Sequence, residues 1–109
     1  MVNFPGISTL NNTTILQTLV AHQQQLTAFG VIEIGLFGSF VRNEQQPNSD
    51  IDLLVDIVPK KKTFRNFMAL VYYLEALFGR KVELVTKQSL SPYIGPQILK
   101  TVQYVPLAS

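Results

Sequence analysis

The chain has 109 residues, and its formal net charge of +2 is too small to indicate nucleic-acid binding by itself. Hydrophobic residues make up 47% of the chain and charged residues only 15%, whereas about 25% of a typical soluble domain is charged. We therefore expect an apolar surface patch that is buried against another molecule. Because the chain has no cysteine, a disulfide scaffold and thiolate metal sites are excluded.

The length predicts a single domain spanning 1–109. The sequence contains no run of about 18 apolar residues, and its N-terminus lacks a basic flank followed by an apolar block. We therefore expect no membrane contact and a soluble protein located in the cytoplasm. Residues 1–10 contain Pro5-Gly6 and follow no hydrophobic period, which predicts a loose N-terminal arm.

The first periodic stretch predicts an amphipathic helix from about Thr13 to Phe29, ended by Gly30. Asn12 or Thr13 is expected to cap its start. His22, the only histidine, lies among glutamines on the polar side, so we interpret it as a solvated surface residue rather than a general base.

Branched and aromatic residues predict a buried strand over 31–37, in which Glu33 is expected to form a salt bridge at an edge or to face solvent. One or two helical turns are predicted over 40–44. A second strand is predicted from Asp50 to about Val58, and Pro59 ends it.

Helical spacing of apolar residues predicts a core helix over 63–78, closed by Gly79. The residues assigned to its core face are Phe64, Phe67, Met68, Val71, Leu74, Leu77 and Phe78. A third strand is predicted over 81–86, and Pro96 favours a short helix near its own position. The alternation of strands and helices predicts an α/β (α+β) fold.

A Gly-Ser pair, Gly38-Ser39, is followed after ten residues by Asp50 and Asp52 at the head of an apolar strand. Side chains alternate along a strand, so the two carboxylates are expected on one face with Cα atoms roughly 6.5 Å apart. Magnesium typically takes one or two protein carboxylates and phosphate oxygens, so the pair suits a metal-bound nucleotide. Gly38 lets the backbone approach a phosphate, and Ser39 can donate to it. The simpler alternative is an ordinary Gly-Ser turn and a loop-ending Ser49-Asp50.

For three further charged residues, the question is whether they belong to this site. Arg42 could reach a phosphate or orient an aspartate. Asp56 shares the face of Asp52 but lies about 13 Å along the strand, too far for the same metal. Glu83 lies in the third strand, where it could be a third metal ligand or a general base, or could simply face solvent on an edge strand.

Basic charge is concentrated at Lys60, Lys61, Lys62 and Arg65. We interpret this cluster as a solvated helix start, and direct nucleic-acid binding is not expected.

These residues resemble a known family. Gly38-Ser39, ten residues and Asp50-Ile51-Asp52 are similar to the signature of the DNA polymerase beta type nucleotidyltransferases. The fuller Gly-Ser-Phe-Val-Arg and Ser-Asp-Ile-Asp-Leu-Leu-Val resemble its minimal nucleotidyltransferases. The chain has Val41 and Asn43 where the family often has Ala and Gly, and Glu83 where it commonly has Asp.

The resemblance implies a nucleotidyltransferase fold with a small mixed β-sheet of three to four strands flanked by helices. It implies that Asp50, Asp52 and Glu83 hold Mg²⁺, two ions in all, and that ATP is the substrate. It further implies an antitoxin that transfers AMP to a tyrosine of a HEPN-domain ribonuclease toxin, its partner in a hetero-oligomer. The alternatives are a non-catalytic module that neutralises its partner by binding, and a small-molecule nucleotidyltransferase, although enzymes of that kind carry extra substrate-binding domains.

Overall fold

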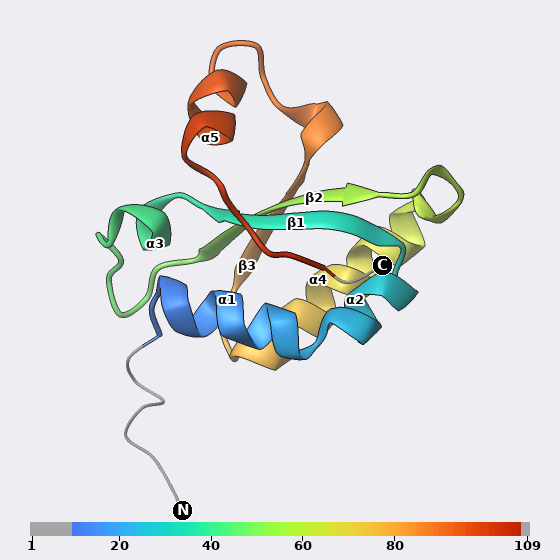
Figure 1. Cartoon of the computed structure of the whole chain (residues 1–109), viewed down its shortest axis with the longest axis horizontal. Helices are drawn as coiled ribbons and strands as arrows, with labels where there is room; N and C mark the ends of the chain where they lie inside the picture. Colours follow the sequence, from blue (N-terminus) through green and yellow to red (C-terminus); the bar gives the residue numbers. More distant parts are fainter. Residues whose placement is uncertain (1–9, 108–109) are drawn as a thin grey trace, which may run out of the picture.

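The computed structural model describes residues 10–107, and the four strands in this part of the chain form one sheet in the order β3-β2-β1-β4 (Figure 1). The strands are β1 (Val31–Phe37), β2 (Ile51–Ile57), β3 (Val82–Thr86) and β4 (Gln103–Tyr104). The helices are α1 (Asn12–Ala21), α2 (Gln23–Ala28), α3 (Ser39–Arg42), α4 (Phe64–Phe78) and α5 (Gly95–Thr101), with single 3₁₀ turns η2 (Pro59–Lys61) and η3 (Lys87–Ser89). The predicted loose arm falls almost entirely on residues 1–9, outside the described part.

The sheet is mixed, as predicted. β1 pairs antiparallel with β2 and with β4, whereas β2 pairs parallel with β3. The parallel pair needs a crossover connection, and α4 supplies it. β4 was not predicted, because two residues are too few to leave a periodic pattern.

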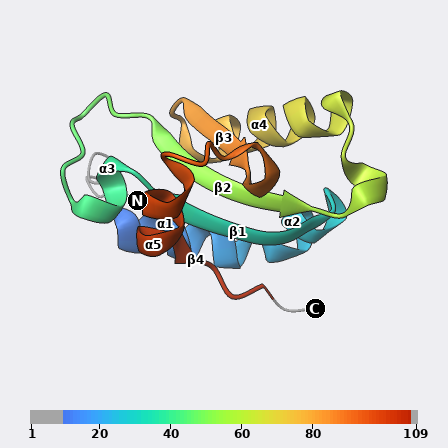
Figure 2. The same cartoon turned by 90° about the horizontal axis from the view of Figure 1, so that it is seen from above.

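The helices divide unequally between the two faces of the sheet. In Figure 1, α1, α2 and α4 lie below the strands and α5 lies above them, and Figure 2 shows α5 in front of the strands from the upper side. The lower layer contains the core, with fully buried side chains from α1, α4 and the sheet. The core residues include Ile15, Leu19, Leu26, Ile34, Leu36, Ile51, Leu53, Val55, Leu70 and Leu74.

The prediction of one continuous helix over 13–29 is wrong. It is divided into α1 and α2 at His22, whose φ of −111° and ψ of 24° are not helical. The N-cap is Asn11 rather than Asn12 or Thr13, because the Asn11 side chain accepts a hydrogen bond from the Thr14 N–H and completes a capping box.

His22 is half-buried rather than solvated. Its Nδ1 lies 2.9 Å from the Thr18 carbonyl oxygen, and its ring meets the Tyr73 ring edge-on at 6.4 Å between centroids. The break in the helix turns the histidine toward α4, so it has a packing role in this structure.

The predicted helix over 63–78 is confirmed. The Thr63 side chain accepts from the Asn66 N–H at its start, and Gly79 takes a left-handed conformation with φ of 62° at its end. Phe64 was wrongly assigned to the core face, since the first turn of α4 leaves this side chain 81% exposed. Leu70, which the periodic assignment omitted, is fully buried instead.

No helix among residues 10–107 is long and apolar enough to cross a membrane.

Candidate active site

The site begins where β1 ends and Gly38 turns the chain. Gly38 has φ of 81° and ψ of −151°, a combination essentially restricted to glycine. A Cβ added here would overlap the Asp52 carboxylate. The turn therefore holds backbone directly against a carboxylate, and any larger residue would displace one or the other.

The short helix α3 starts immediately after this turn. No side chain caps its N-terminus, and the Ser39 hydroxyl makes no hydrogen bond with any residue of the described range. The first turn of α3 and the Ser39 hydroxyl thus keep donors that a ligand can use.

The sheet register brings Glu83 beside Asp52. The two are Cα partners in the parallel β2–β3 ladder, so their side chains share one face of the sheet. Asp50 lies one residue before the start of β2 and two before Asp52, half-buried, whereas Glu83 is exposed on the edge strand. The fold therefore places Glu83 beside Asp52, and the exposure of Glu83 agrees with the alternative of an edge-strand glutamate that faces solvent.

The pKa of the Asp52 carboxyl is shifted by burial and by its charged neighbours. This pKa is raised from 3.8 to about 6, first by burial and then by repulsion from Glu83 and from Asp50, while the positive charge of Arg42 acts in the opposite direction. Asp50, Asp52 and Glu83 make no ion pair with any residue in 10–107. We call these three residues the carboxylate cluster.

The carboxylate cluster has the ligand chemistry of a hard divalent cation. All of its donors are carboxylate oxygens, which suit Mg²⁺, and a cation would relieve the repulsion that raises the Asp52 pKa. In the conformation described for residues 10–107, no three His, Cys, Asp or Glu side chains are grouped so as to hold one ion between them. The ligand set Asp50, Asp52 and Glu83 therefore stays a prediction.

Arg42 does not pair with an aspartate, which was one of its two expected roles. Its Nε donates to Glu44 Oε1 at 2.9 Å, and both side chains are largely exposed. Asn43 follows in a left-handed conformation with φ of 59°, which glycine adopts freely and asparagine tolerates better than most residues. This explains how Asn43 fits at a position where the family that the sequence resembles often has glycine.

The opposite end of the same face has its own polar pairs. Lys87 Nζ donates to Glu33 Oε1 at 2.8 Å, which confirms the salt bridge expected of Glu33, although β1 is an inner strand. Gln88 donates to Asp56 Oδ1 at 3.2 Å, so Asp56 has its own partner away from the carboxylate cluster.

Sequence reasoning missed the C-terminal segment that covers the middle of this face. Gly35 pairs with Tyr104, and a Cβ at Gly35 would overlap Val102. Leu54, the partner of Gly35 on β2, is fully buried although it points away from the helix-covered core. The glycine inside an otherwise branched strand was the available signal, since such a glycine often marks close approach of another backbone.

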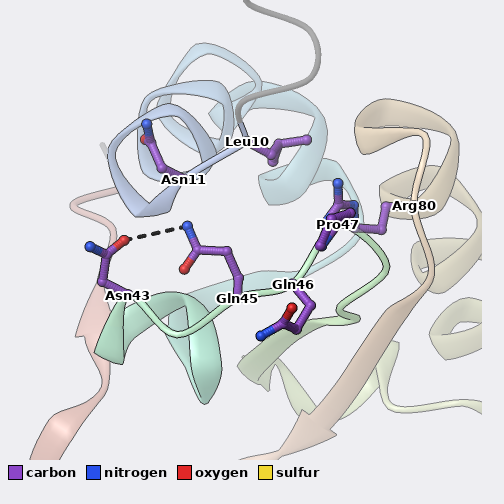
Figure 3. A pocket seen from close by; sticks show the side chains of 7 residues that line it. All are labelled: Leu10, Asn11, Asn43, Gln45, Gln46, Pro47 and Arg80. Carbon is purple, nitrogen blue, oxygen red and sulfur yellow. Dashed lines mark hydrogen bonds between the residues drawn. The ribbon is translucent and has the colours of Figure 1, made fainter.

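A hollow of about 380 Å³ lies between the start of α1, the loop after α3 and Arg80 (Figure 3). Its walls carry the carboxamides of Asn11, Asn43, Gln45 and Gln46. Arg80 donates to the Ser49 carbonyl oxygen at 3.3 Å. None of the predicted catalytic residues lines this hollow, so we do not assign the chemistry to it.

Comparison with known proteins gives a consistent result. The family model of the nucleotidyltransferase domain matches residues 19–105. A protein of Thermococcus cleftensis named protein adenylyltransferase MntA is 47% identical over 88 residues, which cover 80% of this chain and 88% of that protein.

Solved structures share the fold. One described as a minimal nucleotidyltransferase is 29% identical, with a TM-score of 0.74 and coverage of 92% of this chain and 99% of that one. A crystal structure of a toxin-antitoxin with AMP-PNP contains a chain that is 24% identical, with a TM-score of 0.66 and coverage of 92% and 76%. From the matched family model and the 47% identical relative, the chain belongs to the nucleotidyltransferase domain family and is an enzyme of its minimal nucleotidyltransferase kind.

Proposed function

We propose that this enzyme is an antitoxin that transfers AMP from ATP to a tyrosine hydroxyl of a cognate HEPN-domain ribonuclease toxin and thereby neutralises it. The protein adenylyltransferase name of the 47% identical relative supports AMP as the transferred group and a protein as the acceptor. The toxin-antitoxin description of a chain with the same fold supports a toxin as the partner. The HEPN identity and the tyrosine rest on the sequence resemblance.

The observation that carries this proposal is the carboxylate cluster. Asp52 lies against the Gly38 turn on one side and beside Glu83 on the other, and its pKa is raised by burial and by its acidic neighbours. A structural role would favour a counter-charge from the protein, yet none of the three carboxylates has an ion-pair partner in the described range. Such an unbalanced group suits a ligand that brings positive charge.

Asp50 and Asp52 would hold Mg²⁺, two ions in all, with Glu83 as the third ligand. When bound, the metal would neutralise phosphate charge and favour the departure of pyrophosphate. The Ser39 hydroxyl and the backbone after Gly38 would donate to the phosphates, and Arg42 would turn from Glu44 toward them. Its pair with Glu44 is exposed, so exchanging it for a phosphate costs little.

Glu83 has a second available role as general base. Its exposed position on the edge strand leaves it open to a hydroxyl carried by another protein. In that role the carboxylate takes the proton of the acceptor hydroxyl, the oxygen forms a bond to the α-phosphorus, and the bond from the α-phosphorus to pyrophosphate breaks. We place the reaction in the cytoplasm, where ATP and Mg²⁺ are abundant.

The decisive experiment incubates the enzyme with Mg²⁺, α-labelled ATP and the protein encoded by the adjacent gene. We expect label on the partner and a mass increase equal to one or more AMP units. ATP labelled on the γ-phosphate should leave no label, since pyrophosphate departs. Mutating the modified tyrosine to Phe should abolish the label.

Asp52→Asn and Asp50→Asn should each lower labelling by at least about 100-fold, because electrostatic groups at a reacting centre are commonly worth that much. Asp56→Asn is the matched control, since Asp56 is on the same strand and is paired with Gln88 outside the cluster. Equal loss in Asp56→Asn would contradict the assignment.

The toxin assay separates catalysis from binding. If the partner is neutralised equally well by the Asp50→Asn, Asp52→Asn double variant, the protein acts by covering its partner and the proposed AMP transfer is not the mechanism of neutralisation.

A further inference from the structure

We propose a second binding surface, at the end of the sheet opposite the carboxylate cluster, for an acidic segment of a partner protein that carries one large apolar side chain. This surface, which we call the basic groove, consists of Ile57, Lys62, Thr63, Phe64, Phe67 and Gln88 together with the neighbouring Lys60, Lys61 and Arg65. The proposal does not depend on the AMP-transfer mechanism.

The groove itself is a cavity of about 280 Å³ between the end of β2, the start of α4 and the segment after β3. Ile57 is buried and Phe67 is half-buried, and together they form an apolar floor. Phe64, at the rim, is 81% exposed. This volume suits a single large apolar side chain. A phenylalanine left this exposed next to an apolar hollow is a feature of protein contact surfaces.

One cation, Lys62, lines the groove, and three more lie within three residues of it along the chain. Lys60, Lys61, Lys62 and Arg65 are all exposed, and none of their side chains makes an ion pair or hydrogen bond within residues 10–107. The nearby carboxylate of Asp56 accepts from Gln88 at 3.2 Å and offsets only one of the four charges. Charge complementarity therefore selects an acidic partner.

The segment that carries these cations is fixed in place. The Asn66 side chain donates to the carbonyl oxygens of Phe29 at 2.8 Å and Lys61 at 3.0 Å, which ties the start of α4 to the segment before β1. The Lys61 stem packs over Gly30, where an added Cβ would overlap it. A surface held this rigidly loses little conformational freedom when a ligand binds.

A protein segment fits these features better than a nucleic acid. An oligonucleotide would pair its phosphates with the cations but would leave the Ile57 and Phe67 floor without a matching apolar group. An acidic segment with an apolar anchor satisfies both the cations and the floor.

The two binding surfaces are separated along β2. Asp52 and Ile57 lie five residues apart on this strand, or about 16 Å at the usual rise. In Figures 1 and 2 the loop after β2 is at the far end of the sheet from α3. A segment bound in the basic groove would therefore leave the carboxylate cluster open.

The test is a binding assay on the full chain by fluorescence anisotropy. The probes are labelled ten-residue peptides in which one Leu or Phe is flanked by Asp and Glu, the same peptides with Ser in place of the apolar residue, and single-stranded RNA of ten nucleotides. We expect the anchored acidic peptides to bind most tightly. Phe64→Ala should weaken them about 10-fold, with no loss of thermal stability because Phe64 packs little in the free protein.

The charge variant is Lys60→Glu with Lys62→Glu, which should weaken the acidic peptides at least about 10-fold and make binding less sensitive to salt. The matched control is Tyr72→Ala, which removes another exposed aromatic residue of α4, 63% exposed, and should change nothing. The proposal is overturned if the Ser peptides bind as well as the anchored ones, if RNA binds more tightly than every peptide, if no peptide binds at all, or if Phe64→Ala leaves affinity unchanged.

Discussion

The two faces of β2 differ in burial and in polarity, although both belong to one short strand. Ile51, Leu53 and Val55 point into the helix-covered core and are fully buried. Asp52 and Asp56 point to the other face, which α5 covers only in part. The strand thus separates stability from chemistry by the alternation of its side chains. Substitutions on the first face should act through folding, whereas substitution of Asp52 on the second face should act through the reaction.

The largest effect on stability is expected from Leu53→Ala. It deletes a fully buried side chain and should lower the free energy of unfolding by about 3 kcal/mol, measured by urea denaturation. Activity per folded molecule should stay close to that of the parent at low temperature. If activity falls much more than the folded fraction, the two faces are coupled and the comparison fails.

Gly38→Ala should lower both the stability of the fold and the rate of the reaction. The new Cβ overlaps the Asp52 carboxylate at a φ of 81°, so we expect about 2 kcal/mol of lost stability and a large loss of nucleotidyl transfer. Gly79→Ala is the matched control, because Gly79 also has positive φ, 62°, but a Cβ there meets nothing within 4 Å. Gly79→Ala should cost about 1 kcal/mol and leave activity unchanged.

Asp52→Asn should stabilise the metal-free protein while it abolishes the reaction. Because the folded-state pKa of Asp52 is raised from 3.8 to about 6, its favourable contribution is present below pH 3.8 and is lost as the pH rises through about 6. Above that pH the ionised Asp52 is desolvated and repelled by Glu83 and Asp50, with only Arg42 in opposition.

In EDTA the gain from Asp52→Asn should be about 1 kcal/mol at pH 7.5 and smaller at pH 4.5, measured by urea denaturation at both values. Asp56→Asn serves as the control. A variant less stable than the parent at pH 7.5 would show that Asp52 has a structural partner that the fold does not reveal.

The smallest effect belongs to the Glu33–Lys87 ion pair, at the far end of the Asp52 face. A double-mutant cycle with Glu33→Gln and Lys87→Met should give a coupling energy of about 0.5 kcal/mol, because both side chains are more than a third exposed. Labelling activity should be unaffected. A coupling energy above about 2 kcal/mol would contradict this expectation, because it would mean that the ion pair is as strong as one in a buried polar network.

The turn and the strand that carry the predicted site residues were more predictable than the helical layer around them. Gly38, Ser39, Asp50 and Asp52 lie close along the chain, so their arrangement follows from one turn and one strand. The break at His22 was not predictable from apolar spacing, because both halves keep residues that face the core. The exposure of Phe64 was missed for a related reason: helical periodicity assigns a face but does not say where the sheet beneath it ends.

The sequence by itself determined where the chain turns and which residues alternate along each strand, because these depend on backbone preferences and neighbours two residues apart. Only the tertiary structure decided that Glu83 is the register partner of Asp52, that Arg42 pairs with Glu44, and that the C-terminal segment covers Gly35. Register between β2 and β3 depends on how the intervening α4 packs across the sheet, and that packing is a property of the whole core rather than of either strand.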